Sequence, residues 1–143
     1  MTIVTKIGRG CVFEVETKKG PVHDVLFFTV KAPNGEVLTD VRCFKYGEVV
    51  SVDHHGVDEK LPRGMRRWLA KRVYSLAGDY LKKRGLKLIH LRTHKYLGKF
   101  LIRNLGYRKV FETPIGMDVE KNLGQRARRK PVKKTPPRRL RRR

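Results

Sequence analysis

The sequence predicts an α+β domain with a mixed β-sheet, in which an antiparallel N-terminal meander is followed by α-β-α-β, and then an extended basic tail. Apolar residues alternate with a period of two over residues 2–53, and after Met65 the period changes to about 3.6. From residue 124 onward the chain has no such period and carries only basic charges. We therefore divide it into a globular domain, residues 1–123, and a tail, residues 124–143.

The first half is predicted to be an antiparallel meander of four or five strands, because its segments are rich in β-branched and aromatic residues and short Gly or Pro turns separate them. The turn Asn34-Gly35 lies between two such segments and tolerates the positive φ angles of a tight hairpin. A polar loop is expected over residues 54–62. The other strands expected on this basis cover residues 2–8, 11–17, 22–31 and 48–53.

The second half is predicted to alternate helix and strand. A helix begins near Met65 and ends at Gly85, the usual kind of C-terminal glycine. Residues 86–93 are apolar at both alternating sets of positions, which is typical of a central strand covered by helices on each side. A short helix closes at Gly106, and a last strand follows, interrupted near Pro114. The resulting order of β-meander, α, β, α, β implies a mixed sheet.

Charge is the strongest compositional signal: 35 Lys and Arg against 13 Asp and Glu give a net charge of +22 and a pI near 10.7. Such an excess predicts a polyanionic partner, with nucleic acid ahead of an anionic membrane. No apolar run approaches the roughly 20 residues of a membrane span, and the N-terminus lacks the apolar region of a signal peptide. We therefore expect a cytoplasmic protein without a membrane partner, and nothing indicates a homo-oligomer.

The second half resembles the GNAT family of acetyltransferases. The resemblance rests on the glycine-containing turn in "LPRGMRRWLA" (residues 61–70), the helix after it, the following strand, and the "LGY" that ends the short helix, where the family has leucine-glycine-phenylalanine. It covers roughly residues 10–120. It implies a site in which backbone N–H groups at the helix N-terminus bind the pyrophosphate of acetyl-CoA.

The family motif at this turn, Q/R-x-x-G-x-G/A, aligns with Leu61, Gly64 and Arg66. Leu61 and Arg66 depart from it, and Arg66 places a long side chain where the family has a small one. The tyrosine that protonates the leaving thiolate in many family members aligns with Ile102, which has no proton to donate. Tyr96 lies on another face and is expected to pack. These departures predict a degenerate cofactor loop, no cofactor and lost chemistry.

Other reactive side chains favour catalysis or metal binding only weakly. Glu48 and Asp53 are available as general bases, but acidic residues beside a strand are usually solvated. The histidine pairs lack the spacing of zinc ligands on one helical face, so we predict no metal. Cys11 and Cys43 are too far apart in sequence for a CxxC half-site and are expected to be buried thiols.

Basic residues recur wherever the predicted apolar faces turn away, and from Arg63 to Lys109 the only acidic residue is Asp79. Like charges at i, i+4 spacing destabilise a helix slightly, which favours a polyanion that neutralises them. The predicted RNA contacts in the domain are Arg63, Arg66, Arg67, Lys71, Lys82, Lys83, Arg84, Lys95, Lys99, Arg103, Arg108 and Lys109. Those in the tail are Arg126, Arg128, Arg129, Lys130, Lys133, Lys134, Arg138, Arg139, Arg141, Arg142 and Arg143.

Two functions follow from these observations. The first is a ribosomal structural protein that binds rRNA and neighbouring ribosomal proteins through its helical face and tail, with acetyltransferase chemistry lost. Its few Gln and Asn residues resemble thermophile composition, which suggests an archaeal-type ribosome. The alternative is an active GNAT N-acetyltransferase that uses acetyl-CoA on an RNA- or ribosome-associated substrate.

Overall fold

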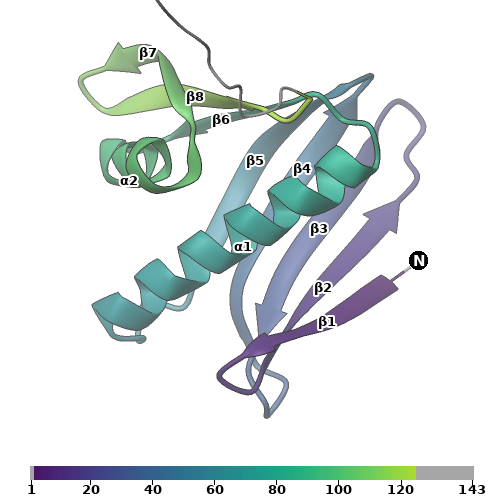
Figure 1. Cartoon of the computed structure of the whole chain (residues 1–143), viewed down its shortest axis with the longest axis vertical. Helices are drawn as coiled ribbons and strands as arrows, with labels where there is room; N and C mark the ends of the chain where they lie inside the picture. The colour runs from purple at the N-terminus through teal and green to yellow at the C-terminus, as the bar shows by residue number, and fades with distance from the viewer. Residues whose placement is uncertain (1, 125–143) are drawn as a thin grey trace, which may run out of the picture.

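In the described part of the chain, eight strands form one mixed sheet, and two helices pack against it (Figure 1). The computed structural model describes residues 2–124, so the predicted RNA contacts from Arg126 to Arg143 lie outside the described residues. The strands run in the order β1-β2-β3-β4-β5-β6-β8-β7. Their bounds are β1 Thr2–Gly8, β2 Cys11–Lys18, β3 Asp24–Lys31, β4 Val37–Tyr46, β5 Val49–Val57, β6 Leu88–Thr93, β7 Arg108–Thr113 and β8 Gly116–Asn122. The helices are α1, Arg63–Lys83, and α2, Lys95–Leu105.

The predicted meander is confirmed, because β1 to β5 pair antiparallel in chain order. Arg9 and Gly10 join β1 to β2 and both have positive φ, the geometry of a two-residue hairpin turn. The Arg9 guanidinium lies 4.5 Å from the ring centroid of Trp68 on α1, which ties this hairpin to the helix layer. At the β3–β4 turn only Gly35 of the Asn34-Gly35 pair has positive φ, and its N–H donates to the carbonyl of Ala32 (2.9 Å).

Strand β5 runs further than the sequence predicted. Residues 54–57, expected to begin a polar loop, continue the ladder with β4 as far as Val57 opposite Thr39. The pairing shifts register between Arg42 and Cys43, so that His54 lies opposite Arg42 and Val52 opposite Cys43, with Asp53 between them. The prediction of a loop was wrong because polar side chains on a half-exposed strand resemble loop composition.

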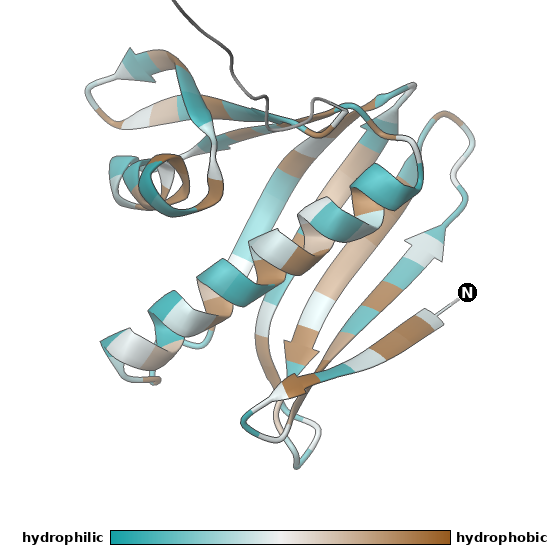
Figure 2. Ribbon diagram, in the orientation of Figure 1, coloured by the Kyte–Doolittle hydropathy of each residue, from teal (hydrophilic) through white to brown (hydrophobic). Residues whose placement is uncertain are grey.

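Helix α1 lies diagonally across the middle strands of the meander (Figure 1). Its buried positions recur at three- and four-residue spacing, namely Leu69, Val73, Tyr74, Ala77, Gly78 and Leu81. Gly85 follows the helix with φ of 84°, as the sequence predicted. In Figure 2 the strands beneath α1 are largely brown, whereas hydrophilic teal segments recur along the helix. The core therefore lies between the helices and one face of the sheet.

Strand β6 is central, between β5 and β8, but only one of its faces is covered by a helix in the described part of the chain. Ile89 and Leu91 are buried on the helix side, while His90 and Arg92 point to the other face and contact Asp118 of β8. The expectation of helices on both sides was wrong. An apolar residue near the strand end can be half-buried by neighbouring strands alone.

Helix α2 packs on the last hairpin of the sheet. Gly106 ends it in the left-handed conformation (φ 78°), as predicted. Gly98 is buried where α2 approaches Met117 of β8. The last predicted strand is two antiparallel strands, β7 and β8, because the chain reverses at Pro114. Cys11 and Cys43 are free and buried, which confirms that prediction. Within residues 2–124 no helix has the length and apolar content to cross a membrane.

Candidate functional site

A cavity of about 390 Å³ lies where the two parallel strands of the sheet separate. Strand β5 pairs with β6 only from Val49 to Val52, opposite Leu88 to Leu91, and beyond these positions the strands diverge (Figure 1). The residues that line it come from the end of β5, the start of α1 and the start of α2: His55, Val57, Arg63, Arg66, Arg67, Ala70, His94, Tyr96, Leu97 and Phe100.

The divergence also frees main-chain groups. Residues 54–57 of β5 keep β4 as a partner on one side, but no strand of the described residues pairs with them on the side of β6. Unpaired N–H and C=O groups along a strand edge are donors and acceptors for an extended ligand that carries amides of its own. The cavity can therefore accept a chain-like ligand between the two strands.

The N-terminus of α1 borders the cavity without a side-chain cap. Pro62 is the N-cap residue, its side chain makes no capping bond, and the first turn contains no acidic residue. The first intrahelical donor is the N–H of Arg66, which bonds the carbonyl of Pro62 (3.0 Å), so the preceding N–H groups have no helical acceptor. A Cβ at Gly64 would meet nothing within 4 Å, so the backbone there is open to close approach. This helix end fits an anion.

Three arginines of the predicted turn, Arg63, Arg66 and Arg67, line the same cavity. The sequence predicts that they face a nucleic-acid backbone, and in the structure all three border this open cavity, with Arg63 and Arg67 exposed. The Nε of Arg66 is buried and has no hydrogen-bond partner among the described residues. An anion in the cavity would satisfy this orphaned donor. The Arg67 guanidinium lies 5.8 Å from the Phe100 ring centroid, which joins α1 to α2 across the cavity wall.

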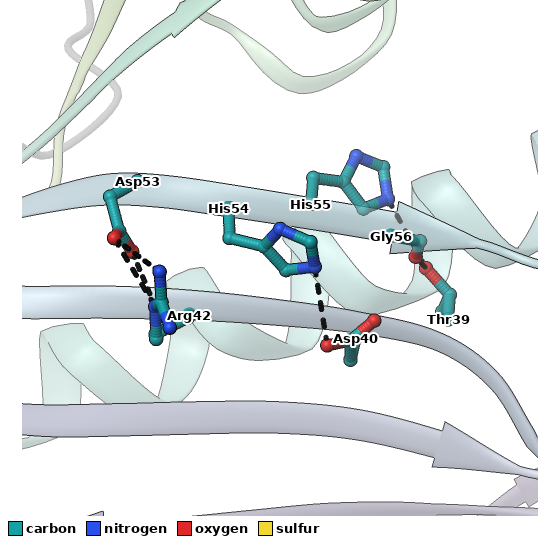
Figure 3. A network of polar contacts seen from close by, with 7 residues as sticks. All are labelled: Thr39, Asp40, Arg42, Asp53, His54, His55 and Gly56. Carbon is teal, nitrogen blue, oxygen red and sulfur yellow. Dashed lines mark hydrogen bonds and ion pairs between the residues drawn. The ribbon is translucent and has the colours of Figure 1, made fainter.

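His55 has a defined tautomer. The Thr39 hydroxyl donates its single proton to the Gly56 carbonyl (2.6 Å), and Thr39 Oγ1 also lies 3.1 Å from His55 Nε2 (Figure 3). Because the hydroxyl proton is already committed, Nε2 must carry a proton and donate to Thr39. His55 Nδ1 is then a bare acceptor, and in Figure 3 it lies on the side of the ring away from Thr39.

Burial keeps His55 neutral. The pKa of its imidazole is lowered from 6.5 to about 4, mainly by desolvation and in smaller part by the nearby His54 and His94. The ring packs edge-on against Tyr74, with centroids 5.2 Å apart. At neutral pH the residue therefore presents a lone pair rather than a charge.

His94 is also protonated on Nε2, but its remaining free nitrogen is the donor, whereas that of His55 is the acceptor. It is the N-cap residue of α2, and its Nδ1 accepts a hydrogen bond from the Leu97 N–H (3.2 Å). Because Nδ1 is an acceptor in this cap, the neutral ring carries its proton on Nε2 and can donate from there. The cavity is thus lined by one histidine that accepts through Nδ1 and one that donates through Nε2.

Tyr96 is the phenol that borders the cavity. Its side chain is 61% exposed, so the expectation that it packs was wrong. The residue lies in the first turn of α2, where the core is covered by Leu97 instead. Ile102, at the position of the family's tyrosine, packs partly buried against the core. Tyr107, the aromatic residue of "LGY", is buried, and burial raises its pKa well above the ordinary range.

The acidic candidates and the other histidines lie away from the cavity. Asp53 is held on the open face of the sheet by two hydrogen bonds from Arg42 Nε (3.0 and 3.2 Å) and one from Arg42 Nη2 (2.8 Å), as shown in Figure 3. Glu48 is exposed in the β4–β5 turn. His54 lies 3.6 Å from Asp40 on the open face. Within residues 2–124 no cluster of His, Cys, Asp and Glu is arranged to hold a metal.

Several predicted RNA contacts already have partners. Lys95 and Lys109 both pair with Glu112 of β7 (3.3 and 3.0 Å), and Arg108 lies 3.4 Å from Glu120 of β8. The sequence count from Arg63 to Lys109 did not include these acids. They lie beyond Lys109 in the chain but beside these basic residues in the fold. Sequence reasoning also missed His55 and His94. Two signals were available. The alternation of β5 continues through His55 to Val57, and His94 stands directly before a helix.

Solved structures similar to this chain include several acetyltransferases. A ribosomal-protein-S18-alanine N-acetyltransferase from Escherichia coli matches with TM-score 0.60 and 16% identity, covering 76% of this chain and 74% of that one. An acetyltransferase from Bacillus cereus matches with TM-score 0.59 and 20% identity, covering 70% and 74%. A GNAT family N-acetyltransferase (YhbS) from Escherichia coli in complex with CoA matches with TM-score 0.55 and 18% identity, covering 69% and 59%.

These matches support the predicted GNAT fold for the described domain. The sequence matches no family profile and no curated protein. The first functional hypothesis, a ribosomal structural protein without acetyltransferase chemistry, is wrong: the similar structures are acetyltransferases, some solved with coenzyme A, and they indicate no ribosomal structural role. The hypothesis failed because a degenerate sequence motif was taken to mean that the cofactor loop was lost.

Proposed function

We propose that the protein is a GNAT-type N-acyltransferase that uses acetyl-CoA, with the cavity between β5 and β6 as its active site. One observation carries the proposal: an uncapped helix N-terminus, three arginines and two histidines of defined tautomer border one cavity at the point where the parallel strands diverge. The thioester of acetyl-CoA supplies an activated acetyl group when it is bound. The residues below bind it, orient the acceptor and handle protons.

Phosphate groups would be held at the start of α1. Arg66 and Arg67 supply charged donors, and the free N–H groups at Arg63 and Gly64 supply neutral ones. The side chain of Arg66, long where the family motif is small, does not remove the anion site but adds a donor to it. The phosphates would be bound more by guanidinium groups and less by an enclosing backbone loop.

The two histidines have different roles in the proposed acyl transfer. In the reaction the amine nitrogen bonds the carbonyl carbon, the carbon–sulfur bond breaks, and one proton leaves the nitrogen while another reaches the thiolate. His55 Nδ1 can accept a hydrogen bond from the amine and orient its lone pair. His94 Nε2–H can donate to an oxygen on which negative charge develops. The Tyr96 hydroxyl is the cavity's candidate donor to the thiolate.

Calorimetry with CoA and acetyl-CoA tests the binding site. We expect Arg66→Gln to weaken both ligands about 10-fold or more, since a charge-assisted hydrogen bond contributes roughly 1.5–3 kcal/mol. Gly64→Ala should leave the protein as stable or up to about 1 kcal/mol more stable, because a Cβ meets no protein atom and alanine favours a helix. It should nevertheless lower the affinity for CoA if a phosphate approaches this backbone.

Lys18→Gln is the matched control, because it removes one positive charge from an exposed residue on the open face of the sheet. It should bind CoA as the unchanged protein does. No heat with millimolar CoA, or equal affinity of the Arg66→Gln variant, would contradict the binding site. Tyr96→Phe should keep CoA affinity while slowing thiol release from acetyl-CoA about 100-fold with a lysine peptide as acceptor. An unchanged rate would remove Tyr96 from the mechanism.

A further inference from the structure

Charge is segregated between the two layers of the molecule. The ion pairs of the described residues lie on the strands and their turns, apart from Lys95 at the start of α2. No side chain of α1 takes part in one, and Asp79 is the only acidic residue of α1. Helix α2 has no acidic residue at all. The helix layer therefore carries positive charge that the described protein does not neutralise.

Six exposed basic residues of this layer lie outside the cavity. We call them the basic helical face: Lys71, Lys82, Lys83, Arg84, Lys99 and Arg103. Lys71 is one turn beyond Arg67 on α1, and the Arg67 guanidinium lies over Phe100 of α2. Lys99 and Arg103 are four residues apart and share one side of α2. Lys82 returns to the side of α1 that carries Lys71, three turns and about 16 Å further along.

The remaining basic sequence begins beside this face. Leu123 is buried, and its N–H donates to the Lys87 carbonyl (2.8 Å), just beyond the end of α1. Gly124 lies next to the Lys87 side chain. From Gly124 onward the sequence contains basic charges and no acidic ones. The chain therefore enters its basic tail beside Lys87, close to the end of α1 that carries Lys82 and Lys83.

The face is better suited to a nucleic acid than to a protein. Protein interfaces have an apolar centre, whereas nucleic-acid interfaces are polar and positively charged. The large exposed apolar side chains of the described residues lie on strands and turns, with Tyr96 the one exception on a helix. Tyr96 stacks near His94, with ring centroids 6.4 Å apart and planes 23° apart, and offers a flat surface at the edge of the cavity.

We propose that the basic helical face binds the phosphate backbone of a nucleic-acid strand. This goes beyond the proposed acyl transfer and does not depend on it, because none of the six residues lines the cavity. Phosphate contacts of this kind carry no sequence information, so the expected binding is strong in low salt and tolerant of sequence.

Fluorescence anisotropy on the full chain tests the proposal with three labelled 20-nucleotide probes: single-stranded RNA, the same strand as DNA, and duplex DNA. The test variant combines Lys71→Gln, Lys99→Gln and Arg103→Gln. We expect its affinity to fall at least 10-fold. The slope of log affinity against log salt should flatten by about 2 on single strands, at roughly 0.7 per lost phosphate contact. The preferred probe identifies the source of the phosphate backbone.

The matched control combines Lys6→Gln, Lys18→Gln and Arg92→Gln, which removes the same charge from exposed residues on the opposite face. Its affinity and salt slope should stay close to those of the unchanged protein. A second test variant, Lys82→Gln with Lys83→Gln and Arg84→Gln, should weaken binding in the same way. Equal losses in test and control variants, or polyglutamate of equal length competing as well as RNA, would overturn the proposal. Both test variants should still bind CoA, so failure of either proposal is recognised separately.

Discussion

In each of the two cavity histidines, one hydrogen bond determines which ring nitrogen carries the proton. The Thr39 hydroxyl donates its proton to Gly56, so His55 must donate to it from Nε2. The Leu97 N–H makes His94 an acceptor at Nδ1. Neither bond can be read from the sequence, because Thr39 is sixteen positions from His55. The sequence did show histidines near the predicted turn, but it did not show that His54 and His55 face opposite sides of the sheet.

The buried His55 predicts a pH dependence of folding. Its pKa is about 4 in the folded protein and near 6.5 when unfolded, so between these values the unfolded chain binds more protons. The free energy of unfolding should therefore fall by on the order of 3 kcal/mol as the pH drops from 6.5 to 4. Urea unfolding at a series of pH values measures this slope.

His55→Gln should flatten that slope, because it removes the group that titrates differently in the folded and unfolded chain. Glu112 and Asp118 do not contribute to the change in unfolding free energy between pH 6.5 and 4, because cations hold their carboxylate pKa values below the ordinary range. The stability they contribute is lost only as the pH falls below about 4. A His55→Gln variant that keeps the full slope would show that His55 is not the titrating group.

At the scale of elements, the close approach of α2 to β8 depends on Gly98. A Cβ there would collide with the side chain of Met117, which is itself buried. We expect Gly98→Ala to destabilise the protein by about 1–3 kcal/mol through overpacking, although alanine is favoured in a helix by about 1 kcal/mol. Chemical denaturation measures the change.

Shortening Met117 should relieve the same collision. The variant with both Gly98→Ala and Met117→Ala should be more stable than the sum of the two single changes predicts, with a coupling of about 0.5–3 kcal/mol. Gly64→Ala serves as the control, since its Cβ is placed in open space. A Gly98→Ala variant more stable than the unchanged protein would refute the close packing.

Most elements could be predicted because their signals are local. The five-strand meander, the glycine that ends each helix and the order of elements follow from residues adjacent in sequence. The errors occurred where neighbours in space decide. Residues 54–57 read as a loop because their polar side chains gave no sign of the β4 partner. Strand β6 was expected to be covered twice because a single strand does not reveal what lies over each face.

At the scale of the molecule, the described core closes at Leu123. This side chain is buried, its N–H donates to the Lys87 carbonyl, and it is the last buried hydrophobic residue of the described range, 2–124. We therefore predict that a chain ending at Gly124 unfolds cooperatively in urea, with a free energy of unfolding within about 1 kcal/mol of the full chain. A larger loss, or a broad transition, would show that the domain boundary after residue 123 is wrong.

By itself the sequence determined the fold class, the breaks between elements and the excess of positive charge, because periodicity, glycine positions and composition act locally. Only the tertiary structure decided where that charge lies and what it surrounds. Divergence of β5 from β6 opened a cavity at "LPRGMRRWLA", and the approach of α2 closed its other side. The turn departs from the family motif in sequence, yet it brings free N–H groups and arginine donors to one cavity, and donors that converge in space are what an anion requires.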